Sequence, residues 1–177
     1  LTGSTAYNNT FYGIWIQSSN NTNATHTHLF NNTFGEAYVY NSLAGSRNVY
    51  FYNLSIDSPA GNFTNYTTLN ISDAMETSTA YTIKWVANTY TLPSKRISFA
   101  QKFVNITNLT GGVSIDSIWW SWLDSEATGI YDDSRFELWK YNSSSTWEIL
   151  NNSPNTAANT LGLTNMNPGS EYGILQE

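Results

Sequence analysis

The densest group of potential metal ligands in the sequence is a short acidic stretch. It places Asp124, Glu126, Asp132 and Asp133 close together in the chain. Carboxylate oxygens are the ligands that Ca²⁺ prefers, although the spacing here is not that of an EF-hand loop. The stretch therefore predicts either a structural calcium site or an ordinary solvated loop, and no other cofactor is expected.

Two histidines form a second pair of potential ligands. His26 and His28 are separated by one residue and would share one face of an extended strand, as in some copper or zinc sites. The sequence shows no third ligand for them. We therefore favour two surface imidazoles in a Thr-rich strand over a metal site.

Three tryptophans lie in one predicted strand, at residues 113–123. Trp120 and Trp122 share one face, and Trp119 lies on the other. Aromatic rings in an exposed row can stack on sugar rings, whereas buried ones pack between sheets. Trp120 and Trp122 are thus the candidate carbohydrate-binding residues, with core packing as the alternative, and an exposed row at Tyr38 and Tyr40 would support the same function.

Groups for acid–base catalysis are scarce in the first third of the chain. Before residue 57 the sequence has only His26, His28, Glu36 and Arg47, and Asp57 follows. Glycoside hydrolysis needs two facing carboxylates, and a calcium-dependent lyase needs clustered acids with a nearby base. The chain has no cysteine, which excludes disulfides, zinc–thiolate sites and cysteine nucleophiles. We predict no catalytic residues and expect that the protein is not an enzyme.

Asn-x-Ser/Thr sequons occur at about twice the frequency that the Asn, Ser and Thr content predicts. They are Asn8, Asn20, Asn23, Asn31, Asn53, Asn62, Asn65, Asn70, Asn105, Asn108, Asn142 and Asn151. This density predicts an N-glycosylated protein that is extracellular or on a cell surface, with Asn/Thr-rich strands and turns as the alternative explanation. The chain begins at Leu1, which suggests a mature, processed or truncated product.

The composition excludes several classes of partner. Charged residues make up 11% of the chain and aromatic residues 15%, which favours β-structure with amide and hydroxyl surfaces over disorder. A net charge of −6 argues against nucleic acid, because phosphate binding needs a basic surface. No apolar run approaches the ~20 residues of a membrane span.

A short sequence motif recurs three times near the N-terminus, and the strands that it forms would have to position these groups. It reads aromatic, Asn, any residue, Ser or Thr, then a large apolar residue, at residues 7–11, 30–34 and 52–56. This almost constant spacing falls within the range of roughly 20–50 residues that is typical of stacked repeats. Short aromatic and β-branched runs between turn clusters predict strands. We therefore expect a parallel β-solenoid of about three coils, in which equivalent Asn and aromatic residues form ladders.

The second half of the chain has a different pattern. Alternating strands are predicted at residues 81–85, 97–106, 113–123, 135–141, 146–150 and 172–175, and six such strands indicate an antiparallel β-sandwich. Residues 57–79 read as an irregular final coil and linker. Charged residues are sparse before residue 79 and frequent after it, whereas sequons show the reverse. The predicted domains are 1–79, a β-helix, and 80–177, a sandwich.

Both halves resemble known families. The Asn-Asn-Thr-Phe and Gly-Ile-Trp-Ile phrases resemble the right-handed β-helix repeats of NosD-type proteins, especially archaeal secreted ones. An Ig-like module, which often follows such helices in archaeal cell-surface and S-layer-type proteins, is resembled by residues 103–108, 124–133, 136–142 and 147–150. The resemblance implies an all-β fold and carries no catalytic residues.

These patterns predict a structural role. We expect a glycosylated subunit of an extracellular filament, pilus-like fibre or surface lattice. Copies of the chain would assemble through strand edges and solenoid ends. One alternative is that the chain is the C-terminal part of a longer β-helix protein. Another is that it is a carbohydrate-binding or adhesion module.

Overall fold

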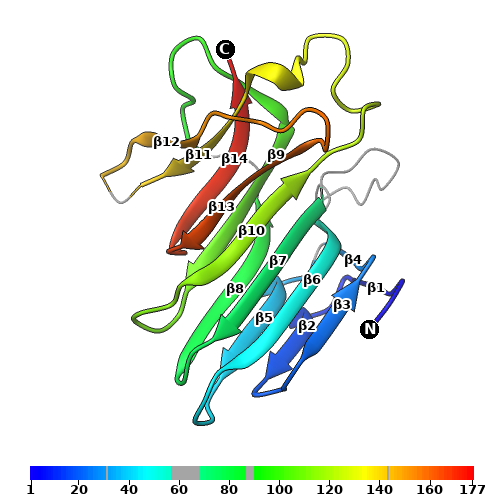
Figure 1. The fold of residues 1–177 in the computed structure, drawn as a ribbon, viewed down its shortest axis with the longest axis vertical. Coiled ribbons are helices and arrows are strands. Elements are labelled where there is room, and N and C mark those ends of the chain that lie inside the picture. The colour runs from blue at the N-terminus through cyan, green and yellow to red at the C-terminus, as the bar shows by residue number, and fades with distance from the viewer. Residues whose placement is uncertain (31, 57–67, 87–89, 143) are drawn as a thin grey trace.

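The described residues of the chain form two stacked β-sheets with seven strands each (Figure 1). This computed structural model describes residues 1–30, 32–56, 68–86, 90–142 and 144–177, without the side chains of residues 53, 55, 56 and 85. The predicted all-β class is confirmed, since the described residues add only a 3₁₀ turn, η1 (Asp133–Arg135). No helix among them is long and apolar enough to cross a membrane.

In the order of each sheet, the first strands of the chain lie toward one end and the last strands lie toward the other. Sheet A runs β1 (Thr5–Tyr7), β4 (His28–Phe30), β6 (Arg47–Ile56), β7 (Thr68–Met75), β10 (Ile115–Ser121) and β13 (Thr160–Met166), and β3 (Thr22–Thr25) also pairs with β6. Sheet B runs β12 (Trp147–Asn151), β11 (Phe136–Tyr141), β14 (Ser170–Gln176), β9 (Ile97–Asn108), β8 (Thr79–Val86), β5 (Gly35–Asn41) and β2 (Tyr12–Gln17). Among the described strands neither sheet closes on itself, so each leaves open edges.

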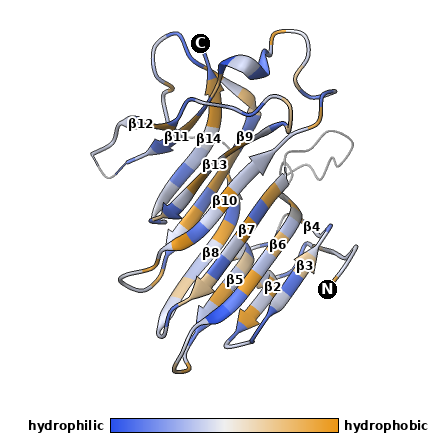
Figure 2. Cartoon of the chain, in the orientation of Figure 1, coloured by the Kyte–Doolittle hydropathy of each residue, from blue (hydrophilic) through white to orange (hydrophobic). Residues whose placement is uncertain are grey.

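The core lies between the sheets and extends along both. Alternating residues of each strand point into it, which gives the alternating colours along the strands in Figure 2. Phe51 and Ile118 of sheet A belong to the same buried cluster as Val39, Ile83 and Ile106 of sheet B. The molecule is therefore a β-sandwich whose core is built by the first and last parts of the chain together.

The first two copies of the repeat stack in parallel, as the spacing predicts. Thr5 pairs with His28 and Tyr12 with Gly35, and the members of each pair occupy equivalent positions in the two copies. The rings of Tyr7 and Phe30 stack with centroids 4.9 Å apart and planes at 2°. The predicted aromatic ladder is thus confirmed between these two copies.

The third copy departs from the predicted register, and a three-coil β-helix is not shown. In β6, Val49 pairs with Thr22 and Ile56 with Leu29, a larger offset along the chain than the one that joins the first two copies. On its other side β6 pairs with β7 in antiparallel orientation, so parallel stacking ends there. We expected an irregular coil and linker here, but the structure has the strand β7. Leu69, Ile71 and Met75 alternate as in a strand, and the buried Asp73 interrupts this apolar pattern.

The six strands predicted after residue 79 all appear, in β8, β9, β10, β11, β12 and β14. As expected, antiparallel pairing joins β8 to β9, β9 to β14, β14 to β11 and β11 to β12. Strand β13 was not predicted. Backbone pairing also crosses residue 79, since β5 pairs with β8 and β7 with β10. Whether the two halves fold independently stays a prediction.

An asparagine ladder links the first two copies inside the fold. Asn32 is only 3% exposed, and its Oδ1 accepts hydrogen bonds from the backbone N of Asn9 at 3.2 Å and from Asn9 Nδ2 at 2.8 Å. Its Nδ2 donates to the carbonyl of Ala6 at 3.2 Å. This buried side chain thus pairs with polar groups of the preceding copy through hydrogen bonds that are partly shielded from water.

We predict that Asn32→Ala lowers the free energy of unfolding by about 2–3 kcal/mol, because it leaves backbone groups of the first copy without partners. Denaturant unfolding at pH 7 measures the change. The matched control is Asn23→Ala, because Asn23 is exposed, and its effect should stay within about 0.5 kcal/mol. Equal effects of the two changes would contradict the role assigned to Asn32.

Candidate functional site

The predicted sugar-binding tryptophans are part of the core. Trp120 is 3% exposed and Trp122 is 4% exposed. The ring of Trp120 packs 6.2 Å from Tyr172, and that of Trp122 packs 5.1 Å from Phe136. Neither ring is accessible to a sugar, so the core alternative holds for both. Trp119, on the opposite face, is 39% exposed.

The predicted calcium ligands are used separately. Glu126 is buried, forms an ion pair with Lys102 and accepts a hydrogen bond from the backbone N of Leu123. Asp132 caps η1 through Ser134, Asp133 accepts a bond from Trp122 Nε1, and Asp124 accepts one from Asn159. Nowhere in the described ranges do three His, Asp or Glu side chains form a group that could hold a metal. The calcium prediction therefore gains no support from the geometry.

The two histidines do not share a regular strand. His26 lies between β3 and β4 with a φ of 50°, and its ring contacts Tyr52 edge-on at 5.7 Å. His28 is the first residue of β4. The turn between them breaks the alternation on which the shared face depended.

None of the sequon asparagines whose side chains are described is buried. Asn8, Asn20 and Asn23 are exposed, and Asn70, Asn105, Asn108, Asn142 and Asn151 are half-buried. Asn70 Nδ2 donates to Ser121 Oγ at 3.0 Å and Asn151 Nδ2 to the carbonyl of Gly162 at 2.8 Å. Asn31, Asn62 and Asn65 and the side chain of Asn53 lie outside the described residues.

An exposed aromatic surface covers the end of sheet B at β2 and β5. We call it the β2–β5 aromatic surface, and it consists of Phe11, Tyr12, Trp15, Phe34, Tyr38 and Tyr40. Trp15 is 57% exposed, and its ring lies 4.8 Å from Tyr38, which in turn lies 6.3 Å from Tyr40. Tyr38 and Tyr40, at which the sequence suggested an exposed row, are half-buried. Trp15 was missed, although it lies between the core-facing Ile14 and Ile16 in the same repeat.

The same end of the molecule carries free strand edges. Strand β2 pairs only with β5, and β1 only with β4, among the strands that are described. Ser18 N donates to the carbonyl of Tyr40 at 2.7 Å. Because N–H groups alternate in direction along a strand, the N–H of Gln17 points away from β5, toward the open edge.

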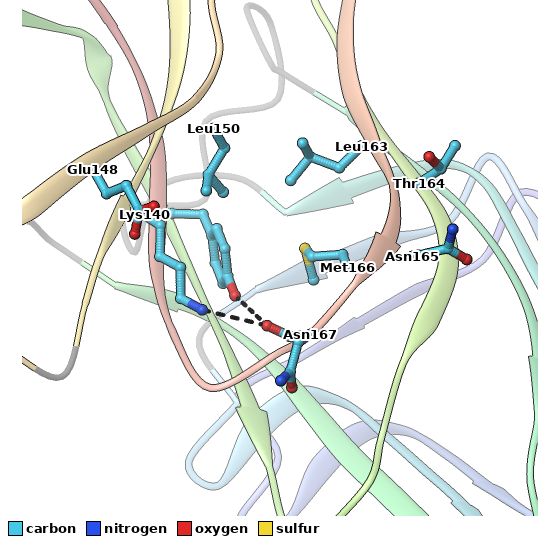
Figure 3. A pocket seen from close by; sticks show the side chains of 9 residues that line it. Lys140, Glu148, Leu150, Leu163, Thr164, Asn165, Met166 and Asn167 are labelled. Carbon is cyan, nitrogen blue, oxygen red and sulfur yellow. Dashed lines mark hydrogen bonds between the residues drawn. The ribbon is translucent and has the colours of Figure 1, made fainter.

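The opposite end of the sandwich has a groove between the two sheets, drawn in Figure 3. It has a volume of about 290 Å³ and lies between β11 and β12 on one side and β13 on the other. Leu150, Leu163 and Met166 form its apolar floor, and Lys140 and Glu148 stand at its rim. Lys140 Nζ donates to the carbonyl of Asn167 at 3.4 Å.

A buried carboxylate lies in the core near the middle of the sandwich. Asp73 of β7 is 2% exposed, and burial, together with the charge of Asp116 on β10, raises its pKa to about 7. Burial likewise raises the pKa of Tyr81 on β8, with Asp73 adding to the rise. At neutral pH Asp73 is thus close to its midpoint of titration.

These features define an all-β sandwich with open edges, an exposed aromatic surface and an apolar groove. Comparison of the chain with protein-family models, with curated proteins and with solved structures finds no match. The predicted relation to NosD-type and S-layer-type proteins therefore stays a prediction.

We predict that Asp73 makes the protein less stable as the pH rises. Its pKa is about 3.8 when unfolded and about 7 when folded, so its stabilising contribution is complete below pH 4 and is lost between pH 4 and pH 7. A tenfold change in the proton affinity of one group corresponds to about 1.4 kcal/mol, which gives a loss of stability of up to about 4 kcal/mol.

The measurement compares denaturant unfolding of the parent and of Asp73→Asn from pH 4 to pH 8. The variant should gain stability relative to the parent as the pH rises. The control is Asp124→Asn, whose carboxylate is exposed, and its curve should run parallel to the parent curve. Parallel curves for Asp73→Asn would refute the prediction.

Proposed function

We propose that the protein is a non-catalytic structural subunit of an extracellular or cell-surface assembly. Copies of the chain would join end to end, with the β1 and β2 edges of one copy against the β13 and β12 edges of the next. In this proposal both sheets continue from subunit to subunit. Such a heterologous contact does not close on itself and builds a filament.

The observation that carries the proposal is the unprotected edge at β1 and β2. Soluble β-proteins usually block their edges with charged residues, proline or bulges. Residues 1–17 contain no Asp, Glu, Lys, Arg or Pro. At the same edge Phe11 and Trp15 are largely exposed. These residues favour pairing with a further strand over exposure to water.

The groove of Figure 3 supports a second copy as the partner. It lies at β12 and β13, the strands that form the opposite edges of the two sheets. Its apolar floor suits an aromatic side chain of the kind exposed at β2. A subunit would thus carry complementary surfaces at its two ends.

Three finer assignments belong to the same proposal. The parallel ladder of residues 1–56 supports a short β-helix, and the antiparallel strands after residue 79 support an Ig-like module. The exposed and half-buried sequons support N-glycosylation, which would keep the sides of a filament hydrated. A surface poor in charge and rich in Asn, Ser and Thr fits an extracellular location.

The test is electron microscopy and light scattering of the native protein, with intact mass in parallel. We expect regular polymers and a subunit mass above 19.8 kDa, the excess coming from sugar. Gln17→Pro removes one outward N–H from β2 without breaking a bond to β5, so it should shift the protein to monomers. Gln17→Ala is the matched control and should still polymerise.

Native protein that is monomeric at micromolar concentration would overturn the assembly proposal. Unchanged polymers of Gln17→Pro would overturn the assignment of the contact to β2. If the native protein is longer and its additional residues cover β1 and β2, it would also be monomeric. That result would equally contradict assembly at this edge.

The β2–β5 aromatic surface favours a second candidate function, carbohydrate binding. Its rings form a row in which the exposed Trp15 contacts the half-buried Tyr38, and Tyr38 contacts the half-buried Tyr40. Such a platform stacks on the apolar faces of sugar rings. Neither polymerisation nor catalysis is required for this function.

We predict that Trp15→Ala weakens binding of neutral oligosaccharides about tenfold, because it removes the most exposed ring of the row. A glycan array followed by titration calorimetry measures the change. Trp119→Ala is the control, since this ring is exposed on sheet A, and its affinity should equal that of the parent. An array with no binding at all would reject the second candidate.

A further inference from the structure

A polar site lies on sheet B on the face opposite to the groove, since Glu171 alternates along β14 with the groove residue Tyr172. It is a cavity of about 410 Å³ over strands β9, β14 and β11. Its principal residues are Tyr90, Asn105, Asn108, Tyr141, Asn142 and Glu171. These strands are neighbours in sheet B, toward the upper part of Figure 1.

The strand register brings the central residues together. Glu171 of β14 pairs with Asn105 of β9 on one side and with Tyr141 of β11 on the other. Directly paired residues of neighbouring strands point to the same face of a sheet. The carboxylate therefore lies between an amide and an aromatic ring.

The carboxylate of Glu171 is buried without a complete set of partners. The residue is 5% exposed, and its Oε1 has no hydrogen-bond partner within the described residues. Burial raises the pKa of Glu171 to about 7. The other titratable groups among the described residues that line the cavity are Tyr90 and Tyr141. Lys84 of β8 pairs with Asn105 and shares this face of the sheet, but it does not line the cavity, and its Nζ donates to the carbonyl of Thr33 at 3.0 Å. A ligand can therefore supply the hydrogen-bond donors that this buried acceptor lacks.

The three asparagines offer donors rather than acceptors. Asn105 Oδ1 accepts from Thr107 Oγ1 at 2.7 Å, Asn108 Oδ1 from the backbone N of Thr110 at 2.9 Å, and Asn142 Oδ1 from that of Ser144 at 2.9 Å. In the described part of the chain, none of the three Nδ2 groups donates a hydrogen bond. The oxygens are engaged within the chain, and the N–H groups remain for a ligand.

An aromatic wall completes the cavity. The rings of Tyr90 and Tyr141 stack with centroids 3.6 Å apart and planes at 11°. Tyr90 is 39% exposed. The stacked pair forms a rigid apolar surface beside the carboxylate and the amides.

We propose that this cavity binds one neutral sugar ring. Hydroxyl groups of the sugar would donate to Glu171 and accept from the amide N–H groups, while its apolar face would lie against the tyrosines. A metal ion fits less well, because the cavity has a single carboxylate and its amide oxygens are engaged. An anionic ligand would be repelled by Glu171.

Two sources supply a sugar of this chemistry. One is a free saccharide or a glycan on another molecule. The other is a glycan on the chain itself, since Asn105, Asn108 and Asn142 are all sequon asparagines. The site is separate from the proposed subunit contact, so it does not depend on assembly.

The test uses the full chain produced without glycosylation. Glucose, galactose, mannose and N-acetylglucosamine are titrated at pH 8.5 and pH 5.5 while NMR or calorimetry measures binding. We expect millimolar affinity for at least one sugar at pH 8.5 and weaker affinity at pH 5.5, where protonated Glu171 is a poorer acceptor. Glu171→Gln should lower the affinity at pH 8.5 at least tenfold and remove the pH dependence.

The control is Glu76→Gln, which removes an exposed carboxylate outside the cavity and should bind like the parent. Thermal unfolding of each variant confirms that the fold is intact. Repeating the titration with Gln17→Pro separates sugar binding from assembly, so that either proposal can fail alone.

Glycopeptide mass spectrometry of the native protein distinguishes the sources. The cavity is assigned to the chain's own glycan if two results are obtained. Sugar is found on Asn105, Asn108 or Asn142, and an endoglycosidase removes that sugar faster from the Glu171→Gln variant than from the parent. Unoccupied sequons with binding in titration assign it to a free or foreign sugar. No binding by the unglycosylated chain, or equal binding by Glu171→Gln, would overturn the proposal.

Discussion

The structure depends on the burial of one face of each open sheet against the other. Burial of apolar surface favours the sandwich, and the continuous core joins strands from both halves of the chain. Because neither sheet closes within the part of the chain that the structure describes, this packing leaves backbone donors and acceptors at both ends of each sheet. The proposed assembly follows from that constraint: polar backbone groups at an edge need water or another strand, and the β1 and β2 edges lack the residues that normally prevent pairing.

The outer faces of the sandwich use amides, hydroxyls and aromatic rings where most proteins use charges. On sheet B this produces two separate regions, the β2–β5 aromatic surface at one end and the Glu171 cavity toward the other. In the first, exposed and half-buried rings lie in a row. In the second, a buried carboxylate, three amides and a tyrosine pair surround a space of about 410 Å³. Both regions suit sugars, and among the residues that define them the carboxylate of Glu171 belongs to the cavity.

Local patterns in the chain were enough to predict several features. The spacing of the first two copies of the repeat predicted the parallel pairing of β1 with β4 and of β2 with β5, since equal spacing places equivalent residues side by side in stacked strands. Apolar alternation predicted most strands after residue 79. The same alternation was present in β7 but was obscured by Asp73, which lies in the core despite its charge.

By itself, the sequence determined the all-β class, the first ladder and the surface rich in amides, because these follow from the order of neighbouring residues. Only the tertiary structure decided that Trp120 and Trp122 are buried, that the four acids of residues 124–133 act separately, and that Glu171 lies between Asn105 and Tyr141. These outcomes depend on which strands pair and in which register. Strand pairing joins residues far apart in the chain, such as Asn105 and Glu171, and no local pattern specifies such contacts.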